Sequence, residues 1–191
     1  MGRRSVPFKK LSLLCAAMSL DPNLLLIRTR TVLSIYRGVA SVTLSKAEMT
    51  VKEESTFYKG DGSFIEDIKA GLSYLADFEP EYRKKDFEAK VSALFETRWM
   101  VELMNKAVEH VRSHMDNGPL YFNILYKSYF DRHKYLNDDL QELLDISHSA
   151  FFDYKREAIL LFGIYLWRYG IPELYRNLSD TSELQHAKTA D

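Results

Sequence analysis

The sequence predicts an all-α protein, and two observations support this fold class. Apolar residues recur at intervals of three and four along most of the chain, which is the spacing of one face of an α-helix. Glycine and proline are few, with 8 Gly and 5 Pro in 191 residues, and they fall between the periodic segments. A hydrophobic content of 46% is enough for a buried core. Strands are therefore expected nowhere outside residues 50–62.

The chain begins with 21 residues that show no clear period and are expected to form a flexible basic leader. Asp21-Pro22 then predicts the start of a helix over residues 23–49. The expected core positions of this helix are Leu26, Val32, Leu33, Tyr36 and Val39, and its expected solvent or ligand side carries Arg28, Arg30 and Arg37.

An N-terminal helical region is expected over residues 22–116. A capping box that opens at Ser63 predicts a second helix to about residue 78, and Pro80 introduces the longest helix, over residues 81–114. The apolar stripe of this long helix favours packing within the monomer over a dimer seam, and it contains Phe87, Val91, Leu94, Val101, Met104, Val108 and Val111. Asn117-Gly118-Pro119 is expected to end it.

Residues 117–177 predict a helix followed by a helix-turn-helix. The first helix, over 120–132, carries Leu120, Ile124, Leu125 and Tyr129 on one face. A short helix over 138–144 follows, with Leu140, Leu143 and Leu144, and then a break at 145–147, where Ser147 is suited to cap a longer helix. The inward face of the longer helix is expected to be Phe151, Tyr154, Ala158, Ile159 and Phe162. Of these, Phe151, Tyr154, Ala158 and Phe162 are expected to pack against the leucines of the short helix. Gly170-Ile171-Pro172 is expected to stop it, and a short turn of helix in PELYRNL and a polar tail over 178–191 are expected to follow. The second helix of such a pair can lie in a DNA major groove.

The segment LLDISHSAFFDYKREAILLF resembles the fourth region of bacterial housekeeping-class sigma factors and, more closely, the ArpU-type phage regulators of Gram-positive bacteria. The matching positions are Leu144, Ile146, Ser147, Ser149, Phe151, Tyr154, Glu157 and Ala158. The preceding FNILYKSYFDRHKYLNDDL is similar to the helix that leads into this module, and IRTRTVLSIYR is similar to the basic first helix of the phage regulators. The resemblance implies a sequence-specific DNA-binding transcriptional regulator with a sigma-region-four-like helix-turn-helix.

The family pattern implies that outward residues in the first turns of the second helix face DNA: His148, Ser149, Phe152, Asp153, Lys155 and Arg156. Arg156 is suited to grip a guanine or a phosphate, and His148 and Ser149 are suited to donate hydrogen bonds. Phe152 is suited to touch a thymine methyl group. Phe152 and Asp153 depart from the family pattern, which often has Arg or Lys there.

The charge is unevenly distributed. The net charge is -1, yet residues 1–46 contain eight Lys or Arg and one acid, whereas residues 120–168 contain six Lys or Arg and seven Asp or Glu. Because phosphate neutralisation dominates affinity, a near-neutral module binds DNA weakly alone. Three explanations stay open: the basic N-terminal region supplies the charge, a homodimer doubles the contacts, or the module contacts a protein such as RNA polymerase and no longer binds DNA.

Other features limit the class of protein. The single cysteine, Cys15, excludes an intrachain disulfide and fits a reducing compartment. The opening RRSVPFKKLSLLCAA imitates a secretory signal, but no run is long and apolar enough to cross a bilayer, so no membrane contact and a cytoplasmic location are expected.

Nothing in the sequence calls for a catalytic or metal site. His110 and His114 have the one-turn spacing of a metal pair without an obvious third ligand, so neither a metal nor another cofactor is expected. We predict a non-enzymatic protein whose partner is double-stranded DNA, with a contact to RNA polymerase and a homodimer left open. A helical enzyme built on dispersed carboxylates is the third alternative.

Overall fold

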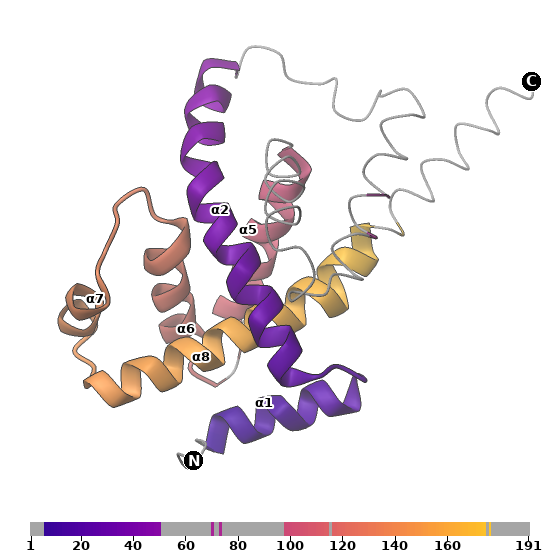
Figure 1. Ribbon diagram of the computed structural model, residues 1–191, viewed down its shortest axis with the longest axis vertical. Helices are drawn as coiled ribbons and strands as arrows, with labels where there is room; N and C mark the ends of the chain where they lie inside the picture. The colour runs from indigo at the N-terminus through magenta and orange to yellow at the C-terminus, as the bar shows by residue number, and fades with distance from the viewer. Residues whose placement is uncertain are drawn as a thin grey trace, which may run out of the picture.

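The computed structural model describes residues 6–50, 98–114 and 116–174, together with the single positions Ala70, Ser73 and Arg176. All regular structure in these residues is helical, which confirms the predicted all-α class (Figure 1). The elements are α1 (Val6–Ala17), α2 (Pro22–Thr50), α5 (Arg98–Arg112), α6 (Gly118–Leu125), η1 (Tyr126–Phe130), α7 (Asn137–Leu143), α8 (His148–Ile164) and η2 (Tyr165–Gly170). The polar stretch at 51–62, most of the helix predicted to end near residue 78, the first part of the predicted long helix and the tail at 178–191 lie outside the described residues.

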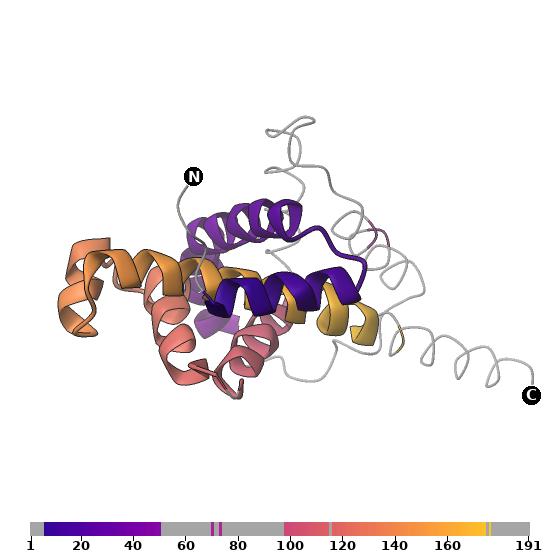
Figure 2. The ribbon, with the colours of Figure 1, turned by 90° about the horizontal axis from the view of Figure 1, so that it is seen from below.

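Helix α8 is the centre of the fold. Helices α1, α2, α5 and α6 all pack against it. In Figure 1 α2 crosses α8. Figure 2, which views the molecule from below, shows α1 alongside α8. Every residue from Glu157 to Ile164 is buried. The second half of α8 is thus enclosed on all sides, as expected of a helix in the interior of a core.

The crossing of α2 and α8 is close at Gly163. A Cβ atom at this position would lie 2.3 Å from Thr29 Oγ1 and 3.1 Å from Leu25 Cγ. Thr29 is fully buried, and its hydroxyl donates a hydrogen bond to the Leu25 carbonyl oxygen at 2.7 Å. The two helices can approach at this point because residue 163 has no side chain.

The N-terminal segment corrects one expectation. Instead of the flexible leader expected over 1–21, Val6–Ala17 form helix α1, which packs against α8. Phe8, Leu11 and Cys15 are buried in the main core, and their spacing of three and four residues places them on one helix face. This helix was not predicted from the sequence for two reasons. Three core positions are too few to show a helical period, and the basic residues and short apolar run of this segment are typical of a leader.

Helix α2 begins where the sequence predicted. The Asp21 carboxylate accepts hydrogen bonds from the backbone N–H groups of Asn23 at 2.7 Å and Leu24 at 2.9 Å, which caps the helix ahead of its first-turn proline. Four of the expected core residues are buried, and these are Leu26, Val32, Leu33 and Tyr36. The side chain of Val39 lies outside the described residues.

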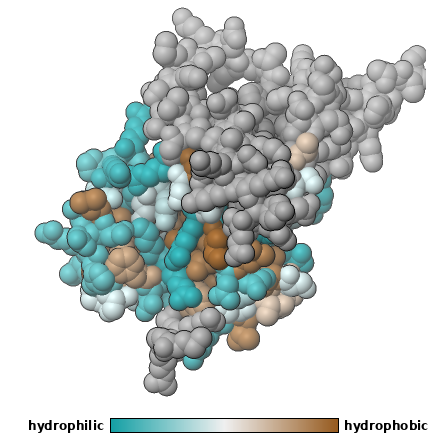
Figure 3. All heavy atoms as spheres, viewed as in Figure 1, coloured by the Kyte–Doolittle hydropathy of each residue, from teal (hydrophilic) through white to brown (hydrophobic). Residues whose placement is uncertain are grey.

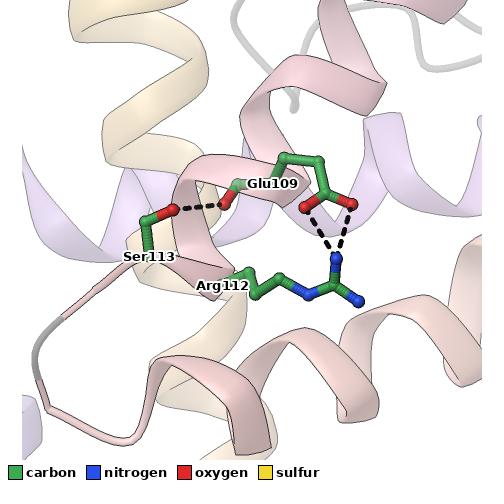
Figure 4. Close-up of polar contacts among 3 residues, drawn as sticks. All are labelled: Glu109, Arg112 and Ser113. Atoms are coloured by element: carbon green, nitrogen blue, oxygen red, sulfur yellow. Dashed lines mark hydrogen bonds and ion pairs between the residues drawn. The ribbon is translucent and has the colours of Figure 1, made fainter.

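Helix α5 buries the described part of its predicted stripe: Val101, Met104, Val108 and Val111. Phe87, Val91 and Leu94 lie outside the described residues. At the end of α5, Glu109 and Arg112 form an ion pair at 3.1 Å, and Ser113 Oγ donates to the Glu109 carbonyl oxygen at 3.2 Å (Figure 4). The Arg112 guanidinium also lies 4.0 Å from the centroid of the Phe122 ring, a cation–π contact that joins α5 to α6.

The boundary predicted at Asn117-Gly118-Pro119 separates α5 from α6, although its residues act differently from the prediction. Asn117, and not the glycine, takes the left-handed conformation, with φ of 54°. Gly118 starts α6, where a Cβ atom would lie 2.6 Å from the Arg112 carbonyl oxygen. The helix then continues through the π-helical turn η1 to Phe130, close to the predicted end.

The expected stop at Gly170-Ile171-Pro172 is absent. The chain passes from α8 through the π-helical turn η2 and stays helical through residues 171–174. A proline inside a regular α-helix crowds the carbonyl four residues earlier, which here is that of Arg168. The η2 turn changes the bonding register, since the Ile171 N–H donates to the Leu166 carbonyl oxygen five residues before it. A π-helical turn of this kind accommodates a proline without ending the helix.

One main core contains residues from segments that the sequence analysis assigned to separate regions of the chain. It contains Phe8 of α1, Leu33 of α2, Met104 of α5 and Phe162 of α8. The predicted boundaries near residues 21 and 116 therefore fall at turns between helices that share this core.

Candidate nucleic-acid interface

The predicted pair of helices corresponds to α7 and α8, joined by a four-residue connection. At the start of α7 the Asp139 carboxylate accepts a hydrogen bond from the Leu136 N–H at 2.8 Å. At its end Asp145 is left-handed, with φ of 51°, and the Ile146 N–H donates to the Gln141 carbonyl oxygen at 3.0 Å. This is the bonding of a Schellman motif, which reverses the chain sharply after a helix. The turn sets the direction in which α8 leaves α7.

Ser147 lies at the N-cap position of α8, as predicted. Its backbone is extended, with φ of -61° and ψ of 151°, and its carbonyl oxygen accepts the Phe151 N–H at 2.9 Å. Its side chain makes no capping hydrogen bond, so the predicted capping by the Ser147 hydroxyl is absent.

A small hydrophobic cluster holds α7 against α8 and α6. Its buried members are Ile124, Leu140 and Phe151. Phe151 is 0% exposed, whereas its neighbour Phe152 is 41% exposed, which confirms the predicted register of α8. Leu143 was expected to face α8 but is 55% exposed, because the inward face of the short helix α7 is centred on Leu140 and Leu143 lies to one side of it.

Ala158 and Phe162 are buried as expected, but not against α7. Both belong to the main core, because α7 has seven residues and meets only the beginning of α8. Tyr154 is half-buried and packs against both the small cluster and the main core, so it connects them.

Four of the six predicted DNA-facing residues are exposed in the first two turns of α8: His148, Ser149, Phe152 and Asp153. We call these four the outer face of α8. The rings of His148 and Phe152 lie 4.8 Å apart between centroids. Together with α7, this end of α8 projects at one end of the molecule in both ribbon views (Figures 1 and 2). The same end is mostly hydrophilic, with separate hydrophobic residues among the polar ones (Figure 3).

The two basic residues of the predicted set are engaged within the protein. Lys155 Nζ donates to Asn137 Oδ1 at 2.8 Å, at the start of α7. The Arg156 guanidinium lies 4.1 Å from the centroid of the Phe8 ring on α1. Both side chains are half-buried. The sequence placed them with the outer face because it shows α8 alone, whereas α1 and the start of α7 occupy the flanks of that helix.

Basic residues of α2 gather near Lys155. The pKa of Lys155 is lowered to about 8, first by burial and then by repulsion from Arg37 and Arg30. Arg37 donates hydrogen bonds to the carbonyl oxygens of Ser128 and, at 3.3 Å, His133, so it lies beside η1. Positive charge from two distant segments therefore converges on one flank of α8.

A buried polar pair went unnoticed in the sequence. Glu157 is 1% exposed, and its Oε2 accepts a hydrogen bond from the Tyr121 hydroxyl at 2.7 Å. Burial and this hydrogen bond raise the pKa of the Tyr121 phenol. A buried carboxylate must be hydrogen-bonded, so the pair joins α6 to α8 at a defined register. The signal that could have revealed it is a lone acid that opens the apolar run EAILLF.

The two histidines considered as a metal pair contact an aromatic residue. The His110 ring stacks on Tyr165 with centroids 5.4 Å apart, and His114 Nδ1 lies 3.4 Å from the Tyr165 hydroxyl oxygen. Among the residues that the structure describes, no group of three or more His, Cys, Asp or Glu side chains is placed to hold a metal ion.

No single helix of the described part of the chain has the length and apolar character needed to cross a membrane. The stretches Pro7–Ala17 and Pro22–Arg37 reach that length and composition only together, and they are bent by 100°. No protein-family model, curated protein or solved structure matches the chain. The family resemblance of residues 143–162 thus stays a prediction.

Proposed function

We propose that the protein is a DNA-binding transcriptional regulator that places the first turns of α8 in the major groove. The observation that carries the proposal is the outer face of α8, which is exposed at one end of the molecule while Phe151 beneath it is buried. A helix anchored at one half and exposed at the other suits entry into a groove. This role requires a cytoplasmic location.

The outer face offers a short set of groups for base recognition. His148 and Ser149 can donate hydrogen bonds to base edges, and Phe152 can contact a thymine methyl group. Asp153 can accept a hydrogen bond from a cytosine amino group, whereas a phosphate would repel it. Asp153 therefore faces bases in this proposal.

Phosphate neutralisation would come from basic residues that flank α8. Arg156 is stacked on Phe8, and a stacked guanidinium still presents N–H groups at its edge. Helix α1 packs against α8 and carries the exposed residues Lys9 and Lys10. Lys10 forms an ion pair with Asp116, with 3.8 Å between Nζ and Oδ2. This placement of α1 supports the explanation in which the basic N-terminal region supplies the charge that α7 and α8 lack.

Selection of binding sites from random duplex DNA, across a series of salt concentrations, tests the proposal. We expect one sequence to be enriched and Asp153→Asn to alter it. Arg156→Ala should weaken binding by about 1–3 kcal/mol. If Arg156 contacts a guanine, the sequence preference should relax at that one base pair, and if it contacts a phosphate, binding to all sequences should weaken alike. Lys106→Gln, on the exposed side of α5, is the matched control for loss of one positive charge. Absence of any enriched sequence at low salt and micromolar protein would contradict the proposal.

One observation favours a second function, that of a protein-contact module. The outer face contains no Lys or Arg, and apolar side chains are exposed on it and beside it: Leu136 at 63%, Leu143 at 55% and Phe152 at 41%. Apolar residues with a polar surround are typical of protein interfaces. In this alternative the partner is a polymerase subunit, another regulator or a second copy of the chain. Phe152→Ala would then weaken a protein complex, seen by sedimentation or pull-down of RNA polymerase, while the wild type selects no DNA sequence.

A further inference from the structure

A polar stripe runs along one face of α2 where this helix passes η1 and α8. It consists of Arg30, Ser34 and Arg37, whose spacing of four and three residues places them on one helix face, and we call it the arginine stripe. Arg30 and Ser34 are exposed, and Arg37 is half-buried. The two arginines are two helical turns apart, about 10 Å along the axis, which is within the combined reach of their long side chains.

Lys155 of α8 approaches the same place. Its Nζ lies 5.4 Å from the centroid of the Tyr129 ring in η1, and Arg37 donates to the carbonyl oxygen of the adjacent residue, Ser128. The electrostatics agree with this proximity. Burial raises the pKa of Tyr129, and the charges of Arg30 and Arg37 oppose that rise. The same two arginines act with burial to lower the pKa of Lys155.

Within the described ranges, none of these three cations forms an ion pair with a carboxylate. The ion pairs in those ranges are Lys10 with Asp116 and Arg112 with Glu109, and neither involves a residue of α2 or α8. Clustered positive charge with several N–H donors is the chemistry that binds phosphate oxygens. The attraction of a bound dianion to each of the three cations would offset their mutual repulsion.

We infer that the arginine stripe and Lys155 form a binding site for a phosphate group on the flank of α8. The guanidiniums of Arg30 and Arg37, the Ser34 hydroxyl and the Lys155 ammonium would supply the donors. Arg37 and Lys155 already use some of their N–H groups inside the protein, but a guanidinium carries five and an ammonium three, so donors remain. The phosphate belongs either to the DNA backbone or to a free phosphate compound, and the site stands whether or not the outer face reads bases.

The first assay uses inorganic phosphate and the full-length chain. Thermal unfolding is followed as phosphate replaces chloride at constant ionic strength, since a ligand that binds only the folded state raises the midpoint temperature. The wild type and Lys106→Gln should be stabilised alike. Arg30→Gln should bind phosphate about tenfold more weakly, because a charge-assisted contact is lost. Arg30 is exposed, so this variant should stay folded, and Lys155→Gln provides a second test from α8.

The second assay identifies the source of the phosphate through the salt dependence of duplex DNA binding. If the site holds the DNA backbone, Arg30→Gln should reduce the slope by about 1 and Lys106→Gln should not. If it holds a free phosphate compound, Arg30→Gln should lose the thermal effect with an unchanged DNA slope. If the wild type binds no duplex, the proposed function fails and the thermal assay alone decides the site. Equal behaviour of Arg30→Gln and Lys106→Gln in every available assay would overturn the inference.

Discussion

Replacement of Phe151 by alanine tests whether the small cluster alone holds α7 in place against α8. The Phe151 ring is 0% exposed, and its buried neighbours are Ile124 at 0% and Leu140 at 1%. Truncation of a fully buried phenylalanine leaves a cavity and costs about 3–5 kcal/mol. The loss is large beside a total stability of roughly 5–15 kcal/mol for a whole domain.

The loss from Phe151→Ala should be felt first in α7. Ile124, Leu140 and Phe151 form a cluster of their own, whereas α2 and α5 contribute to the main core. We therefore expect the amide protons of α7 to exchange faster in the variant while those of α2 and α5 keep more of their protection. Hydrogen exchange measures this difference by segment, and denaturant unfolding measures the total loss of stability.

Phe152→Ala is the matched control, because it removes the same ring from the next position. Phe152 is 41% exposed, so its truncation should cost less than about 1 kcal/mol. It should nevertheless weaken the binding assigned to the outer face. Equal losses of stability in the two variants, or a loss below about 1 kcal/mol for Phe151→Ala, would refute the reasoning about register and burial.

Three further substitutions test other parts of the fold. Gly163→Ala should cost about 1–3 kcal/mol through overpacking against Thr29, and much of this cost should vanish in a Thr29→Ala background, which thermal unfolding of the single and double variants would show. The pKa of Lys155 is about 8 in the folded chain and 10.5 as its ordinary value, so the unfolded state binds more protons between these limits and stability should rise with pH from about 8 towards 10. Lys155→Met should flatten that rise in denaturant unfolding, and an unchanged slope would count against it. Asp145→Gly should stabilise the protein slightly, by less than about 1 kcal/mol, because relief of the left-handed backbone at Asp145 outweighs the conformational entropy that a glycine adds to the unfolded chain, and a lower melting temperature would contradict this.

The sequence by itself determined the helical class and the register of α8. Helical periodicity and capping are local properties, set by residues three or four positions apart and by the first polar group of a helix. For this reason the start at Asp21-Pro22 and the burial of Phe151 beside an exposed Phe152 were correctly predicted. The break between α7 and α8 was found by the same local signals.

Only the tertiary structure decided what surrounds α8. The segment expected to be a flexible leader forms a helix whose Phe8 side chain is buried in the main core. The Arg156 guanidinium contacts the Phe8 ring and therefore does not lie on the outer face. The pairing of Glu157 with Tyr121 and the approach of Lys155 to the arginine stripe join segments that lie 36 residues or more apart in the chain. Such contacts depend on how the helices pack. Packing depends on the shapes of several helix faces at once, and the spacing of residues within one segment does not specify these shapes.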